Sequence, residues 1–390
     1  MMNFSKDFFM NNRKRLAEMH PNSIIIVGSN RPMQRSGDNP YPFHQDGNFW
    51  YLTGIIEPNL VLVIDTKNNV DLIAVPNESA EDRTFNGTID TNEFEEISGV
   101  TRYISYDEGR AMHKYFDQYE KVYMNLAKKR EGIVINGLRN SLYEEVKGST
   151  KSLSDIRPSL DNLRMIKQPQ EIEAIKKAIS ITKEALSEVA LAVKKGSQNE
   201  QELESIINQY FAKECVEHAF EPIVASGKNG LVLHYNKNNQ DFNRTDGTVL
   251  FDIGAEYNGY CADIARTYVL GSNSIAEKLT RAVLTTQKEI IKYLKPGITW
   301  KQLQAFSEEY LIKHLTIAGE TVDDSNIKNY FPHSVGHFLG LDAHDTGNYR
   351  HPLSENMVIT IEPGYYNPAV GFGIRIEDVV LITSSGAEVL

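Results

Sequence analysis

Two aspartates, Asp252 and Asp263, lie in the apolar stretch FDIGAEYNGYCADIARTY on either side of the pair Asn258-Gly259. Asn-Gly between two apolar runs predicts a β-hairpin with a type I′ turn, because both central residues of that turn have positive φ. With this turn Asp252 pairs with Ala265, and the two aspartates become diagonal neighbours on one face of the hairpin. Carboxylates at that separation can reach two cations about 3.5–4 Å apart.

The alternative is an exposed hairpin whose aspartates are solvated. Val249, Phe251 and Ile264 lie in the flanking strands, and these apolar residues are not typical of a surface ribbon. Aspartates that are buried without a partner cost free energy. We therefore expect cations beside this pair.

A second acidic pair follows near the C-terminus. The run MVITIEPGYYNP places Glu362 at the end of a β-branched strand, and FGIRIEDVVLI places Arg375 and Glu377 on one strand face. Neither β-propensity nor solvation favours a glutamate inside an apolar strand. A buried Arg-Glu ion pair is an alternative for this segment alone, but it leaves the two aspartates unexplained.

Three histidines, His333, His337 and His344, lie in the segment FPHSVGHFLGLDAHD of a chain with ten histidines in all. The segment is not the zinc motif HExxH, because Ser334 stands where that motif has its glutamate. A histidine cluster alone is more often structural than ligating. Four inward carboxylates and one neutral imidazole would nevertheless hold two divalent cations, and oxygen-rich ligation favours Mn²⁺ or Co²⁺, with Zn²⁺ as a further candidate.

Regular elements must position these side chains, and the first part of the chain alternates short apolar runs with helical patterns. This alternation predicts an α/β domain with an at least partly parallel sheet. Strands are expected at residues 23–28, 49–54, 59–65, 71–76 and 121–126, and helices near 4–19, 107–118 and 138–147. Phe85 lies in the segment DRTFNG of this domain.

The second part predicts helices packed on a largely antiparallel sheet. The strongest break falls at Arg157-Pro158, and we expect domains at residues 1–159 and 160–390. A long helix should begin at Pro169 and end at Gly196. Further helices are expected at 199–213, 274–294 and 300–318, and strands at 247–254, 260–270, 356–362 and 373–383.

Composition excludes several functional classes. The chain has 390 residues, 41 Lys+Arg against 52 Asp+Glu, and a formal charge of −11, without a basic stripe that would bind nucleic acid. It has no apolar run of about 18 residues, so no membrane span is expected. The N-terminus reads as an amphipathic helix, and two cysteines cannot form a disulfide framework. We expect a cytoplasmic protein.

The order Asp252, Asp263, His337, Glu362, Glu377 resembles the five-ligand dinuclear centre of the pita-bread metallopeptidases, a family that includes methionine aminopeptidase, aminopeptidase P and prolidase. The strings HSVGHFLGLDAHD, ITIEPGYY and GIRIEDVV resemble the family's motifs, and the N-terminal passage YPFHQDGNFWYLTGIIEPNLVLVI is similar to the first domain of aminopeptidase P. The resemblance implies an aminopeptidase P-type α/β N-terminal domain and an α+β pita-bread catalytic domain.

The resemblance also implies roles. Asp263 and Glu377 would bridge two metals, Asp252 would bind one, and His337 and Glu362 the other. A hydroxide bridging the metals would attack the peptide carbonyl, and Glu362 would pass the proton of the water to the leaving nitrogen. Five further residues complete the expected catalytic site. His234, His333 and His344 would bind the substrate or its oxyanion, and Arg375, through Tyr366, would orient Asp252.

Three functions stay open at this point. The first is an aminopeptidase for peptides with proline at the second position, and the second is prolidase, which performs the same chemistry on dipeptides. The third is a non-catalytic pita-bread module that binds peptides or proteins. The resemblance further implies a homo-oligomer, a dimer or a tetramer. Many bacterial relatives carry tryptophan where this chain has Phe85, which leaves its preference for long substrates open.

Overall fold

The computed structural model describes residues 4–126, 137–150, 152–197, 199–242, 244–245 and 247–390. The chain divides into two compact units, Met1–Arg164 and Met165–Leu390. The helix α7 (Arg157–Met165) ends at this division and contains the expected domain boundary between residues 159 and 160. Each unit is described separately below.

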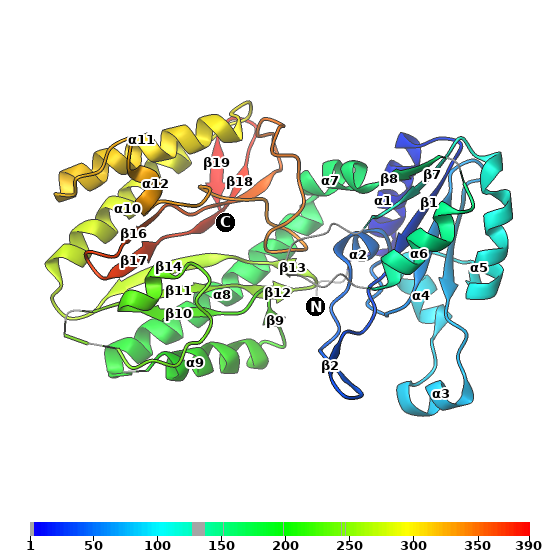
Figure 1. The fold of residues 1–390 in the computed structure, drawn as a ribbon, viewed down its shortest axis with the longest axis horizontal. Coiled ribbons are helices and arrows are strands. Elements are labelled where there is room, and N and C mark those ends of the chain that lie inside the picture. The colour runs from blue at the N-terminus through cyan, green and yellow to red at the C-terminus, as the bar shows by residue number, and fades with distance from the viewer. Residues whose placement is uncertain (1–3, 127–136, 151, 198, 243, 246) are drawn as a thin grey trace. The chain divides into compact units, whose positions relative to one another are not determined.

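The N-terminal unit is built on a six-stranded mixed sheet (Figure 1). Its central strands β1, β4 and β5 pair antiparallel, whereas β6, β7 and β8 join the sheet in parallel, which confirms the expected partly parallel arrangement. In spatial order the strands are β6 (Tyr103–Ser105), β5 (Val70–Val75), β4 (Val61–Asp65), β1 (Ser23–Gly28), β7 (Lys121–Met124) and β8 (Leu153–Asp155).

The three helices expected in this unit are present. They are α1 (Lys6–Met19), the pair α5 (Tyr106–Met112) and η1 (His113–Gln118), and α6 (Gly137–Lys147). The helices α5, η1 and α6 pack on one face of the sheet, where Phe116 and Val146 contact the apolar cluster that includes Ile26 and Val63. Two short helices, α3 (Ala80–Asn86) and α4 (Thr91–Ser98), and a small hairpin of β2 (Gln34–Ser36) and β3 (Asn39–Pro40) were not expected. Phe85 lies on α3 with 78% of its surface exposed.

The expected strand at residues 49–54 is wrong, because this run forms the helix α2 (Gly47–Thr53). Its N-cap Asp46 accepts hydrogen bonds from the backbone N–H groups of Asn48 and Phe49, and Gly54 ends the helix with φ 71°. A fully buried helix carries apolar residues on every side, so hydrophobic periodicity cannot separate it from a buried strand. The aspartate before the run and the glycine after it were the signals that favour a helix.

The C-terminal unit confirms the expected long helices and antiparallel strands. The helices are α8 (Pro169–Lys195), α9 (Glu200–Lys213), α10 (Ser274–Tyr293), α11 (Trp300–Ala318) and the short α12 (Ile327–Tyr330). Within this unit α10 and α11 lie on one side of the strands, and α8 and α9 on the other (Figure 1). Among the described strands every pairing of this unit is antiparallel.

The strands of this unit form four small sheets rather than one. In spatial order the first is β10 (Ile223–Ser226), β11 (Thr248–Ile253) and β14 (Ile264–Val269), and the second is β13 (Tyr260–Cys261), β12 (Ala255–Tyr257) and β9 (Glu217–His218). The third is β15 (Val358–Ile361), β18 (Asp378–Ile382) and β19 (Ala387–Val389), and the fourth is β16 (Gly364–Asn367) and β17 (Phe372–Arg375).

The predicted hairpin register is confirmed. Asp252 pairs with Ala265, and Asn258 and Gly259 form the turn with φ 51° and 80°. Both values lie in the left-handed region that a type I′ turn requires. In the part of the chain that the structure describes, no helix combines the length and the apolar character needed to cross a membrane.

Candidate metal centre

Four acidic residues and one histidine of the C-terminal unit converge from separate strands and loops. Asp252 lies on β11, Asp263 directly precedes β14, Glu362 directly follows β15, and Glu377 lies between β17 and β18. His337 comes from the segment before the single bridge that joins Phe338 to Ile359 of β15. Residues at strand ends are held by the neighbouring ladders, so these side chains are placed on rigid backbone.

His337 stands at the middle of this cluster. Its Nε2 lies 3.5 Å from Asp263 Oδ2, 3.5 Å from Glu362 Oε1 and 3.9 Å from Glu377 Oε1. Ligand atoms of Asp263, His337 and Glu377 lie within 4.8 Å of one another, close enough to surround a single ion. The backbone is close as well: at Gly336 a Cβ would lie 1.9 Å from Thr360 O, so only glycine lets the segment carrying His337 approach β15.

Two carboxylate oxygens of the cluster lack partners. Asp252 uses Oδ2 to accept from Arg375 Nη2 at 2.6 Å and Nε at 3.2 Å. Among the residues that the structure describes, Asp252 Oδ1 and Glu377 Oε1 are buried and have no hydrogen-bond partner. An unsatisfied buried oxygen costs free energy, and a bound cation removes that cost. The donor set therefore fits hard divalent cations.

The electrostatics of the cluster support the same conclusion. Burial raises the pKa of Glu362 to about 8, and the carboxylate of Asp252 adds to the shift against the opposing Arg375. Burial, together with the neighbouring carboxylates, also raises the pKa of Asp263 and of Glu377. Burial lowers the pKa of His337 to about 4, so its imidazole is neutral at neutral pH. Without cations the cluster would hold protons, and a neutral imidazole is the form that binds metal.

A chain of polar groups connects Arg375 to His333. Arg375 Nη1 donates to the hydroxyl of Tyr366 at 2.9 Å, and that hydroxyl lies 3.0 Å from His333 Nε2. His333 Nδ1 lies 2.8 Å from the carbonyl oxygen of Ser334, which can only accept, so we assign the ring proton to Nδ1. The Tyr366 hydroxyl then donates to Nε2. Burial lowers the pKa of His333 to about 4, in keeping with this neutral tautomer.

The other two expected histidines lie at the edge of the cluster. His344 is exposed, and its ring contacts that of His337 with centroids 4.4 Å apart and planes at 72°. His234 is exposed in the segment after η2 (Gly227–Leu231), and among the described residues its ring makes no hydrogen bond to the five clustered side chains. It is tied to them through the backbone, because Leu233 O accepts from Arg375 Nη2 at 3.4 Å.

Sequence reasoning did not identify Glu200, which organises the segment that carries His234. This fully buried carboxylate accepts from the backbone N–H and the hydroxyl of Ser226, both at 2.7 Å, and from Asn229 Nδ2 at 2.7 Å. It also accepts from the Tyr235 hydroxyl at 2.8 Å and the Gln240 N–H at 3.1 Å. In the sequence Glu200 resembles any acidic residue in the first turn of a helix, so only the fold identifies it.

Sequence reasoning also missed an ion pair, Lys167 with Asp345, which supports the segment that carries His337 and His344. Lys167 Nζ and Asp345 Oδ2 lie 3.0 Å apart with both side chains fully buried. Asp345 directly follows His344, and its N–H donates to Phe338 O at 2.9 Å, so the pair anchors both ends of the segment between His337 and His344. The one signal in the sequence was the position of Asp345 beside a candidate histidine.

The fold, the buried acidic cluster and its neutral histidine define a metal-dependent hydrolase, and comparison with known proteins identifies its family. Residues 173–384 match the model of metallopeptidase family M24, and residues 9–123 match that of the aminopeptidase P N-terminal domain. The chain belongs to metallopeptidase family M24 and is a metallo-exopeptidase with an aminopeptidase P-type N-terminal domain.

Individual relatives are similar to this chain over almost its whole length. The Xaa-Pro aminopeptidase of Haemophilus influenzae is 32% identical, over 100% of this chain and 95% of the relative. A solved Bacillus anthracis structure assigned to aminopeptidase P has TM-score 0.91 and 31% identity, covering 99% of this chain and 94% of its own. Aminopeptidase P from E. coli with the inhibitor Pro-Leu has TM-score 0.87 and 27% identity, covering 99% and 95%. The expected fold class, with both domains, is thereby confirmed, and the non-catalytic alternative is excluded.

Proposed function

We propose that this metallo-aminopeptidase removes the N-terminal residue from peptides with proline at the second position, using two divalent cations. The observation that carries the proposal is the approach of three carboxylates, Asp263, Glu362 and Glu377, to within 3.9 Å of His337 Nε2. Among the described residues, Asp252 and Glu377 also have buried oxygens without a hydrogen-bond partner. Four carboxylates around one ion would leave excess negative charge, whereas two divalent ions balance it.

The ligand assignment is the one that the family resemblance implies. Asp263 and Glu377 would hold both ions, Asp252 would hold one, and His337 and Glu362 would hold the other. Oxygen-rich ligation favours Mn²⁺, with Co²⁺ or Zn²⁺ as alternatives. When bound, two such ions polarise a carbonyl group and lower the pKa of a shared water enough for it to attack near neutral pH.

The chain's own groups handle the proton. Glu362 takes the proton of the attacking water and delivers it to the leaving nitrogen. This delivery is needed because the nitrogen of any amide, including the tertiary nitrogen of an Xaa-Pro bond, must be protonated to leave as an amine. Glu362 Oε2 lies 3.6 Å from His333 Nδ1, so the carboxylate stands between the ligand cluster and the substrate-binding histidines.

The three histidines hold the substrate. His333 and His344 lie in one segment and His234 in another, and in this proposal all three bind the peptide or its tetrahedral oxyanion. Both ring nitrogens of His333 have protein partners in this structure, so His333 would exchange one of these hydrogen bonds for the substrate. Arg375 keeps Asp252 oriented by its two hydrogen bonds and keeps Tyr366 oriented by a third. The catalytic set is therefore Glu362, His234, His333, His344, Arg375 and Tyr366.

The choice of substrate is supported by two relatives. The Haemophilus influenzae relative is named for Xaa-Pro cleavage, and the E. coli structure holds the inhibitor Pro-Leu. Prolidase remains the alternative, since the chemistry at the metals would be identical. A homo-oligomeric assembly and a cytoplasmic location stay predictions.

A turnover assay tests the proposal. The protein is stripped of metal, supplied with Mn²⁺, Co²⁺ or Zn²⁺ in turn, and assayed on Xaa-Pro-Xaa, Xaa-Pro and the matched Xaa-Ala-Xaa peptides. Cleavage of Xaa-Pro-Xaa that depends on added metal and exceeds cleavage of Xaa-Ala-Xaa supports the proposal. Activity confined to Xaa-Pro would establish prolidase instead, and undiminished activity without metal would contradict the two-ion centre.

A further inference from the structure

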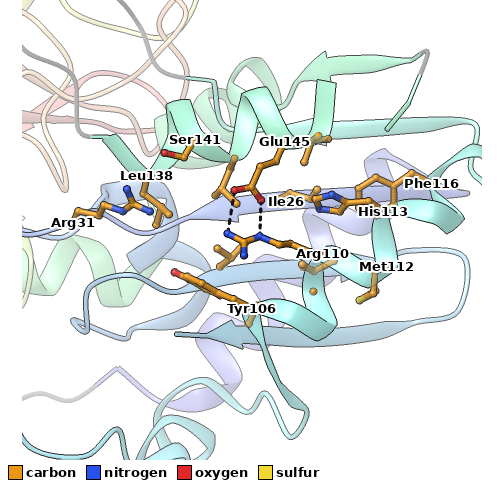
Figure 2. Close-up of a pocket in the computed structure, with 16 residues that line it drawn as sticks. Ile26, Arg31, Tyr106, Arg110, Met112, His113, Phe116, Leu138, Ser141 and Glu145 are labelled. Atoms are coloured by element: carbon orange, nitrogen blue, oxygen red, sulfur yellow. Dashed lines mark hydrogen bonds and ion pairs between the residues drawn. The ribbon is translucent and has the colours of Figure 1, made fainter. Parts of the chain in front are cut away.

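The N-terminal unit contains a cavity of its own, with room for a small ligand. It has a volume of about 60 Å³ and lies between α5, η1 and α6 above the sheet (Figure 2). Ile26 of β1, Val63 of β4 and Ala74 of β5 form its floor, and Phe116 and Leu142 belong to its walls. The floor is wholly apolar, so an apolar group would be favoured there.

An ion pair between Arg110 and Glu145 joins two helices that line this cavity. Arg110 of α5 donates from Nε to Glu145 Oε2 of α6 at 3.3 Å and from Nη2 to Glu145 Oε1 at 3.4 Å, as the dashed lines in Figure 2 show. Arg31 is a second cationic residue in the lining. The side chains of Arg110 and Glu145 are 58% and 36% exposed. An exposed pair of this kind contributes little to stability, so a ligand with its own charges can replace it at small cost.

We propose that this cavity binds a small apolar α-amino acid, of which L-leucine is the test case. The side chain fills the apolar space, the carboxylate lies against the guanidinium groups of Arg110 and Arg31, and the ammonium lies against Glu145. A zwitterion supplies one partner for each member of the existing ion pair, so neither charge is left unpaired.

Size and net charge agree with this ligand. One water molecule needs about 10–15 Å³ of cavity volume. The cavity of about 60 Å³ therefore accommodates roughly four to six groups, each of the size of a water molecule. The four carbons of a leucine side chain fall in this range, whereas an indole ring does not. Arg110 also lies beside a second carboxylate, with Asp107 Oδ1 3.6 Å from its Nη1, so its charged surroundings suit a ligand without net charge. Burial lowers the pKa of the nearby His113, which keeps that ring neutral.

A simple carboxylic acid is the main competing ligand. It would fill the apolar space and pair with arginine, but it would leave Glu145 facing an anion, which is unfavourable. Free apolar amino acids are also the products that an aminopeptidase releases. This link uses only the class of the enzyme and not the proposed preference for proline.

Titration of the full chain with L-leucine, followed by saturation-transfer NMR, tests the proposal. In Ser141→Phe a bulky ring replaces a half-buried lining residue, and binding to this site should be lost. Asn140→Phe is the matched control, because Asn140 is an exposed residue of the same helix that does not line the cavity, and its binding should equal that of the wild type. The two variants also separate this cavity from leucine bound at the metal centre as a product.

Charge variants test the polar half of the proposal. Glu145→Gln should weaken L-leucine about tenfold and leave 4-methylpentanoate, which has no ammonium, unchanged. Arg110→Gln should weaken both ligands. These substitutions of exposed side chains keep the test valid if Ser141→Phe fails to fold, which thermal unfolding would reveal. Equal leucine binding in wild type and Ser141→Phe, or equal affinity for leucine and 4-methylpentanoate, would overturn the proposal, whatever the peptide assay shows.

Discussion

The metal centre and the N-terminal cavity place charge in opposite ways. At the metal centre Glu377 is only 2% exposed, and it shares its surroundings with three other carboxylates and one arginine. At the cavity Arg110 is exposed and Glu145 half-buried, and the two are already paired above an apolar floor. Buried charge without enough partners makes a ligand necessary, because desolvation is not otherwise compensated. A charged side chain that is already paired and in contact with water is stabilised without a ligand, so a ligand is not required there. The predictions below test this contrast.

The largest effect is expected at Asp263 and Glu377, the two carboxylates proposed to hold both ions. Asp263→Asn or Glu377→Gln removes one negative charge from a site where the ions are held by charge balance. Because loss of a group that only supports a ligand already costs about 10–100-fold, loss of a ligand should reduce turnover by more than a hundredfold and lower metal content. Turnover, metal analysis and circular dichroism on the same samples check this. Full activity with less than one bound ion would contradict the assignment.

Arg375→Lys should cause the second-largest loss of activity. Arginine donates two hydrogen bonds to Asp252 and a third to Tyr366, and a lysine ammonium cannot reproduce this planar geometry. We expect a 10–100-fold loss of metal affinity or of kcat. Arg157→Lys is a matched control, since Arg157 also donates from Nε and Nη2 to an aspartate, Asp155, but in the N-terminal unit. An equal loss in both variants would mean that Arg375 is purely structural.

Much of this centre could be predicted from the sequence, because its ligands obey local rules. The Asn258-Gly259 turn fixes the register that places Asp252 opposite Ala265. Strand parity predicted Arg375 and Glu377 on one face of a single strand at 373–383, but the structure divides this run into β17 and β18, with Glu377 between them. These rules relate residues within one hairpin or one strand. The five side chains converge only after β11 and β14 pack against β17 and β18 and the loop that carries His337 pairs with β15. Their meeting was therefore inferred from the resemblance and not from spacing.

Other parts could not be predicted for the same physical reason. Glu200 and Lys167 act on partners far along the chain, and no periodicity marks a buried carboxylate that accepts five hydrogen bonds. Helix α2 was missed because a continuous apolar run is compatible with a strand. The cavity of the N-terminal unit depends on the side-chain packing of α5 and α6, which secondary-structure reasoning does not address.

Glu200→Gln should mainly change substrate binding. It replaces an acceptor-only carboxylate with an amide, so one oxygen becomes a donor facing donors such as Ser226 N–H and Asn229 Nδ2. The segment carrying His234 should loosen, raising KM several-fold to about tenfold while kcat changes less, because His234 is not a metal ligand. Steady-state kinetics measure KM and kcat separately, and an unchanged metal content is the control. A fall in kcat at constant KM would contradict this role.

Metal should stabilise the protein more strongly as the pH rises. The raised pKa values of Asp263, Glu377 and Glu362, about 8 for the last, mean that the folded metal-free protein holds more protons than the unfolded chain. Its stability therefore falls as the pH rises from the unfolded carboxyl pKa of about 4 toward about 8. Cations replace those protons.

The measurement is the difference in Tm with and without Mn²⁺, at about pH 5.5 and about pH 8. We expect this difference to be larger at the higher pH by several degrees, since about 1 kcal/mol moves the midpoint of a domain this size by roughly 2–4 °C. Sodium chloride at matched ionic strength controls for screening. A difference that is the same at both pH values would show that the carboxylates are ionised before the cations bind.

The smallest effect on stability is expected at the cavity, in contrast to the large effects expected at the metal centre. Arg110→Gln breaks an ion pair whose members are mostly solvated, so its Tm should stay within about 1 °C of the wild type. The same substitution should weaken L-leucine, because a bound zwitterion excludes water and makes the guanidinium its main partner. Differential scanning calorimetry with and without leucine measures both effects on one sample. If Arg110→Gln instead lowers Tm by many degrees, the pair is a structural tie between α5 and α6, and the cavity loses the feature that would let a ligand replace it.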